Sequence, residues 1–168
     1  VCFDSLAVPS DIYNVLTPIA RRVSLESDAA KLAPRERTSH KGLYGHLLII
    51  GGDKGMSGAA RIAAEAGARV GAGLLSVATR SAHAPFLNLT RPELMCHGVE
   101  EVKQLEPLLK AANALTVGPG LGQSNWAVTS FQKAIETNLP MVVDADALNL
   151  LSKNPQYHDH WVLTPHPG

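Results

Sequence analysis

Short apolar runs, several of which end at glycine-rich loops, make up most of the chain. Residues 46–50 (His-Leu-Leu-Ile-Ile) are apolar without alternation and end at two glycines, which is typical of a strand buried on both faces. Similar runs predict strands at residues 74–78, 114–117, 141–143 and 161–163. Because helical segments lie between several of these runs, we expect an α/β fold with a mostly parallel sheet and helices on both faces.

Helical spacing is clearest from Ser57 to Val70. Small and apolar residues recur there at three- and four-residue steps, and they predict the buried face of the helix: Ala59, Ile62, Ala63, Ala66 and Val70. A further helix is predicted over residues 125–137, and a short one follows residues 144–146 and continues to Leu151.

Residues 1–38 differ from the rest of the chain. They contain three prolines and a charged stretch at residues 35–37, with one short helix predicted over residues 25–32. We interpret them as a preceding segment plus a linker, and we expect a domain to span residues 39–168. Since the first residue is Val1, we expect the natural protein to be longer.

The charge balance argues against large polyanionic partners. Fifteen basic and fifteen acidic residues give a formal net charge of zero, whereas nucleic acids and membrane surfaces attract an excess of Lys and Arg. The two cysteines, Cys2 and Cys96, lack metal-ligand or redox-pair spacing. No apolar run approaches the ~18 residues of a membrane span, and no secretory signal is visible. A cytoplasmic protein is therefore expected.

Two glycine-rich loops follow predicted strands and are candidate binding loops. Residues 51–59 lead into a predicted helix, whose unpaired N–H groups favour an anion. Their spacing matches neither the Walker phosphate loop nor the Rossmann fingerprint. Residues 118–122 (Gly-Pro-Gly-Leu-Gly) are expected to form a stiff wall, almost free of side chains, for a flat ligand or sugar. An ordinary turn is the alternative for both loops.

Two further loops contain polar candidates. Asp144 and Asp146 share a direction if the chain is still extended there, and a carboxylate can orient a hydroxyl or hold a hydrated Mg²⁺. Helix capping is their alternative role. His166 lies between two prolines, whose rigidity suits a ligand contact, although a lone histidine is more often a surface or core residue. Because ligands of such sheets bind beyond the carboxyl ends of the strands, we expect one site.

At these loops the sequence resembles the ADP- or ATP-dependent NAD(P)H-hydrate dehydratases, the C-terminal domain of bifunctional NAD(P)H-hydrate repair enzymes. The matching stretches occur in family order across residues 39–168: 40–42, 45–52, 71–74, 91–95, 118–122, 144–148 and 163–168. Each stretch alone is only weakly specific for the family, but all of them together are specific for it. Residues 1–38 look like the tail of the N-terminal epimerase domain plus the linker.

The resemblance implies a ribokinase-like fold and the repair of hydrated NADH or NADPH. A nucleotide, ADP or ATP with Mg²⁺, phosphorylates the added hydroxyl, and phosphate then leaves more readily than hydroxide would. By analogy, the residues that contact the hydrated dinucleotide are Ala59, Gly120 or Gly122, and His166. Those near the phosphates and metal are Gly51, Gly52, Asp144, Asp146 and Asn149.

The family's Gly-x-Gly-Asp motif, with its catalytic aspartate, is expected after Gly168. We therefore expect the C-terminal part of the fold to be missing and the chain alone to be inactive. Two alternatives remain: a small-molecule kinase of the same fold, acting on a vitamin precursor or sugar, and a dinucleotide-binding module without chemistry. A homo-oligomer is compatible with each of these functions.

Overall fold

The computed structural model describes residues 7–17, 24 and 34–166. The chain divides into two units, residues 1–38 and 39–168. In the first unit, the 3-10 helix η1 (Ser10–Asn14) follows Pro9. The helix predicted over residues 25–32 lies outside the described residues. No helix in the described ranges is long and apolar enough to cross a bilayer.

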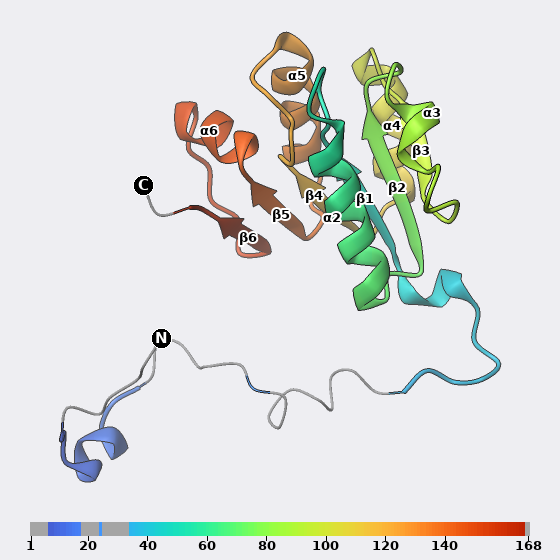
Figure 1. The fold of residues 1–168 in the computed structure, drawn as a ribbon. Helices are drawn as coiled ribbons and strands as arrows, with labels where there is room; N and C mark the ends of the chain where they lie inside the picture. Colours follow the sequence, from blue (N-terminus) through green and yellow to red (C-terminus); the bar gives the residue numbers. More distant parts are fainter. Residues whose placement is uncertain (1–6, 18–23, 25–33, 167–168) are drawn as a thin grey trace. The chain divides into compact units, whose positions relative to one another are not determined.

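The second unit contains a six-stranded parallel sheet (Figure 1). Its strands are β1 (His46–Ile50), β2 (Leu74–Thr79), β3 (Met95–Gly98), β4 (Ala114–Val117), β5 (Met141–Asp144) and β6 (Trp161–Thr164). Their order across the sheet is β3-β2-β1-β4-β5-β6, and all five pairings are parallel. The predicted parallel α/β sheet is confirmed, and β3 is a strand that the apolar pattern did not predict.

Helices cover both faces of the sheet, as predicted. On one face, α2 (Ser57–Val70) and α3 (Ala84–Leu87) pack on β1, β2 and β3. On the other lie α4 (Val102–Ala111), α5 (Asn125–Ile135) and α6 (Asp146–Lys153). The 3-10 helix η3 (Lys41–Tyr44) leads into β1, and Figure 1 shows α2 in front of the sheet with α4 and α5 behind.

Successive residues of β1 enter different cores. Ile49 packs with Val77 in the cluster under α2, whereas Leu48 and Ile50 belong to the larger cluster under α4, α5 and α6. All three β1 side chains are fully buried. This alternation explains why the strand reads as a continuous apolar run.

The predicted buried face of α2 is wrong. The helix buries Ala60, Ala64 and Gly67, while Ile62 and Val70 are 71% and 84% exposed. The helix carries small residues on most sides of its circumference, so the spacing of its apolar residues does not identify one buried face. A Cβ on Gly67 would lie 2.7 Å from Leu47 Cδ2, so the helix approaches the sheet most closely where it has no side chain.

Helix α4 was also not predicted. It contains Pro107, which is unusual inside a helix because proline has no N–H to donate. A capping box between Glu101 and Gln104 stabilises its first turn, and Leu105 and Leu109 provide its buried face.

Candidate functional site

The loops after β1 and β4 lie together at the point where the strand order reverses. Gly52 N donates to Pro119 O over 3.0 Å, and Asp53 N donates to Gly120 O over 2.7 Å. A Cβ on Gly51 would lie 2.2 Å from Pro119 O, so only glycine allows this approach. Crevices at such reversal points are where open α/β sheets bind ligands. The structure thus brings the two predicted glycine loops into direct contact.

Three predicted ligand-contacting residues lie on the loop after β4 or in the first turn of α2. Gly120 has φ +59°, and a Cβ there would lie 3.3 Å from the Cβ of the exposed Ala59. A Cβ on Gly122 would lie 3.4 Å from Asp53 Oδ2. Met56 lies closer still to both glycines, so this surface is formed by backbone, small side chains and the Met56 side chain.

The two aspartates at the end of β5 bind different segments: Asp144 binds the end of β6 and Asp146 binds the loop after β4. Asp144 Oδ1 accepts from Thr164 Oγ1 over 2.6 Å, and Asp146 Oδ2 accepts from Gly122 N over 2.8 Å. Between them Ala145 has φ +44°, so the chain is not extended and the condition for a shared direction is not met. Neither aspartate is the N-cap of α6, because that position is Ala145, which makes no side-chain cap hydrogen bond.

A cavity of about 400 Å³ lies beyond the ends of β5 and β6. It includes the predicted residues Asp146, Asn149 and His166, but Asp144 is not among its lining residues. The Asp146–Gly122 hydrogen bond joins this cavity to the glycine loops. All four predicted loops are therefore connected by hydrogen bonds at one edge of the sheet.

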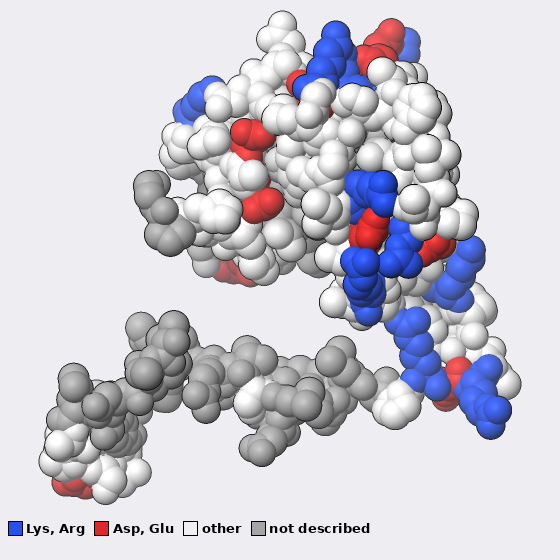
Figure 2. Space-filling view, viewed as in Figure 1, with Lys and Arg blue, Asp and Glu red and all other residues white. Residues whose placement is uncertain are grey.

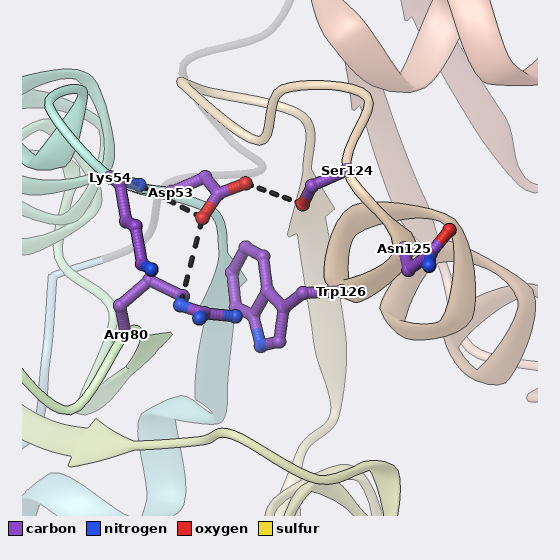
Figure 3. Close-up of a pocket in the computed structure, with 6 residues that line it drawn as sticks. All are labelled: Asp53, Lys54, Arg80, Ser124, Asn125 and Trp126. Atoms are coloured by element: carbon purple, nitrogen blue, oxygen red, sulfur yellow. Dashed lines mark hydrogen bonds and ion pairs between the residues drawn. The ribbon is translucent and has the colours of Figure 1, made fainter.

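A second cavity, of about 330 Å³, lies beside the loop after β1 (Figure 3). Its lining residues are Asp53, Lys54, Arg80, Ser124, Asn125 and Trp126. Asp53 is only 8% exposed and accepts from Ser124 Oγ over 2.5 Å. Figure 3 shows Asp53 between Ser124 and Arg80, with the Arg80 guanidinium beside the Trp126 ring.

Several of these residues were not predicted as part of a site. Arg80 follows β2, and Ser124 is the N-cap of α5, a position that a serine before a helical segment could have indicated. His83 Nδ1 lies 3.0 Å from Gly52 O, although no sequence pattern singled it out. Trp126 is buried.

Two shifted pKa values belong to residues outside both cavities. Arg61 holds the pKa of Glu65 below its ordinary value by donating a hydrogen bond, and Arg69 and Arg91 add to this effect. Figure 2 shows this mixed basic and acidic group over α2. Burial, together with the charge of His46, lowers the pKa of His97. Among the described residues, no three His, Cys, Asp or Glu side chains gather closely enough to hold a metal without other ligands.

Comparison with known proteins gives consistent results. Residues 47–168 match the family model described as NAD(P)H-hydrate dehydratase. A bifunctional NAD(P)H-hydrate repair enzyme from Coxiella burnetii is 50% identical over 98% of this chain and 34% of that protein.

Two solved structures are similar to the chain. A ribokinase-like superfamily protein from Enterococcus faecalis has a TM-score of 0.74 and 29% identity over 79% of this chain and 49% of that one. The ADP/ATP-dependent NAD(P)H-hydrate dehydratase of Bacillus subtilis, co-crystallised with ATP and Mg²⁺, has a TM-score of 0.66 and 26% identity over 83% of this chain and 50% of that one. The predicted ribokinase-like fold is confirmed, and the chain spans about half or less of the length of these three proteins.

Proposed function

Because this chain belongs to the NAD(P)H-hydrate dehydratase family, we propose that its protein converts hydrated NADH or NADPH back to NAD(P)H using ADP or ATP. The observation that carries the proposal is that hydrogen bonds connect the loops after β1, β4 and β5, and the ends of β5 and β6, at one sheet edge. This edge is where ligands of open α/β sheets bind.

The partly buried surface around Gly120 and Gly122 is proposed to bind the dinucleotide. Ala59, Gly120 and Gly122 offer close backbone approach, and His166 lies in the cavity that Asp146 joins to Gly122. Rigid backbone supports this role, because a preformed surface loses little entropy when a ligand binds. The phosphates are proposed to lie near Gly51, Gly52, Asp144, Asp146 and Asn149. The N–H groups of Gly51 and Gly52 already donate to Ala78 O and Pro119 O, so the polar side chains of the other three residues would make the contacts.

These polar residues fit a hydrated Mg²⁺ held together with phosphate oxygens. Mg²⁺ in such sites keeps several waters and takes one or two carboxylates, so a cluster of three is not required. Asp144 and Asp146 each keep one carboxylate oxygen that accepts no hydrogen bond from the described residues. When bound, the ion would neutralise charge on the transferring phosphate.

The chain's own residues are proposed to bind and orient the dinucleotide so that its added hydroxyl faces the nucleotide. Positioning of this kind supplies a large part of phosphoryl-transfer catalysis. The Gly-x-Gly-Asp motif of the family does not occur in these 168 residues. We therefore propose that the chain alone contributes binding and not turnover.

The test is to incubate hydrated NADH with ADP or ATP and Mg²⁺ and to follow the recovery of nicotinamide absorbance. The assay uses this chain and, in parallel, the natural gene product that contains it. We expect the gene product to release NADH and free phosphate, and the chain to show no turnover. A stable phosphoester product would instead indicate a small-molecule kinase. If the gene product binds NADPH in calorimetry but turns over no hydrate, it is a binding module. A cytoplasmic location and the oligomeric state stay predictions.

A further inference from the structure

Asp53 connects three segments that are distant in sequence. Its backbone N–H donates to Gly120 O over 2.7 Å, and its Oδ2 accepts from Ser124 Oγ over 2.5 Å. Its Oδ1 accepts from Lys54 N over 2.8 Å. Asp53, in the loop after β1, therefore binds both the glycine loop after β4 and Ser124, the residue immediately before α5.

The hydroxyl of Ser124 donates to Asp53. Ser124 Oγ accepts from Ala127 N over 3.3 Å as the N-cap of α5, so its single hydrogen is left to donate to Asp53. A carboxylate can accept from Ser124 and Lys54 at the same time through its two oxygens. An asparagine has one acceptor oxygen, and because the two donors bind different oxygens of Asp53, it satisfies only one of them in this geometry.

Arg80 balances the buried charge of Asp53. Its Nε lies 3.6 Å from Asp53 Oδ1, and one of its terminal nitrogens lies 2.8 Å from Glu100 Oε2. The guanidinium lies over the Trp126 ring at 5.3 Å from its centroid, and Trp126 Nε1 is itself held by Val99 O over 2.7 Å. Asp53 is thus fixed from the side of β2 as well as from α5.

From this arrangement we infer that Asp53 is a positioning residue: it holds the loop of residues 118–122 in the conformation that binds the dinucleotide. The inference rests on the proposed function for the identity of the ligand. The geometry of the loop does not depend on that identity, because every contact named above lies within the protein. Asp53 acts through the bond of its backbone to Gly120 and the bond of its side chain to Ser124, which directly follows this loop segment, and it has no proposed contact with the reacting atoms.

The first experiment measures the loop directly. Hydrogen–deuterium exchange of residues 118–124 is compared with that of β1 in the wild type and in Asp53→Asn. We expect the exchange of residues 118–124 to become faster by on the order of tenfold relative to β1, since a charge-assisted hydrogen bond is lost. Ser124→Ala removes the same hydrogen bond from the other side and should accelerate exchange in the same segment.

The control is Leu109→Ala, which removes a buried side chain from the last turn of α4 without touching this network. It should lower the melting temperature without a selective change in residues 118–124. Selective acceleration of residues 118–124 in Asp53→Asn and in Ser124→Ala, without it in Leu109→Ala, supports the inference. An unchanged exchange rate in Asp53→Asn, or the same rise in Leu109→Ala, would overturn it, whether or not the protein turns over the hydrate.

The second experiment uses the natural gene product and hydrated NADPH. Asp53→Asn should raise KM for the dinucleotide by about tenfold and leave kcat within about twofold, because the loss is in ligand positioning. Leu109→Ala should leave KM unchanged. A fall in kcat at constant KM would contradict the positioning role. A wild type without any turnover would refute the proposed function, and the exchange experiment would then decide on Asp53.

Discussion

Replacing Gly120 with alanine tests whether the two glycine loops touch as closely as the structure indicates. Gly120 has φ +59°, a conformation that costs an ordinary L-residue about 1–2 kcal/mol. The new Cβ would also lie 2.4 Å from Met56 O and 2.9 Å from Met56 Cβ. Because the nearest atom is backbone, the loop must shift, and overpacking of this kind costs about 1–3 kcal/mol. The shift also weakens the 2.7 Å hydrogen bond from Asp53 N to Gly120 O.

Gly55 provides a matched control on the neighbouring loop. Its φ is +81°, but a Cβ there would meet nothing within 4 Å. Gly55→Ala therefore carries the backbone cost without the contact. Part of that cost is offset in both variants, because alanine restricts the unfolded chain by about 0.4–1 kcal/mol more than glycine does.

We expect Gly120→Ala to lower the free energy of unfolding by about 3 kcal/mol and Gly55→Ala by about 1 kcal/mol. Urea denaturation of the two variants and the wild type, followed by circular dichroism, measures the difference. If the two substitutions cost the same within about 0.5 kcal/mol, the close contact between the loops does not exist in solution and the reasoning fails.

Three further predictions concern helix α2 and the sheet. Gly58→Ala should stabilise the protein by about 0.5–1 kcal/mol, since a Cβ there meets no atom within 4 Å. Gly67→Ala should destabilise it, because its Cβ would lie 2.7 Å from the Leu47 side chain of β1. Thermal melts of the two variants and the wild type measure both effects. The lowered pKa of Glu65 means that its contribution to stability is present above pH 4.5 and is lost as the pH falls through the lowered value. Glu65→Gln should therefore lose less stability on acidification than the wild type does, and equal losses would contradict the ion pairs. Because the pKa of His97 is lowered in the folded protein, stability should fall as the pH decreases below 6.5. His46→Gln should raise the pKa of His97, which an NMR titration measures. An unchanged pKa of His97 in this variant would exclude an influence of His46.

Much of the fold followed from local pattern. The run at residues 46–50 predicted a strand buried on both faces, because apolar residues on both sides of a strand require a core on both sides. Glycines after β1 and β4 predicted the loops that approach one another, since few other residues permit such backbone contact. The positions of the four loops followed from the rule that parallel strands end at a common edge.

The tertiary structure decided how side chains on those elements are used. Helix α2 has its own alanines on most of its sides, so its sequence does not show which side faces the sheet. Only the packing of Gly67 against Leu47 and Leu75 shows it. Asp144 and Asp146 looked like a pair, yet the positive φ of Ala145 sends them to different segments. Arg80 and Ser124 reach Asp53 from positions 27 and 71 residues away. Sequence pattern reports periodicity along one segment, whereas these contacts depend on the distances between segments, which exist only once the sheet has formed.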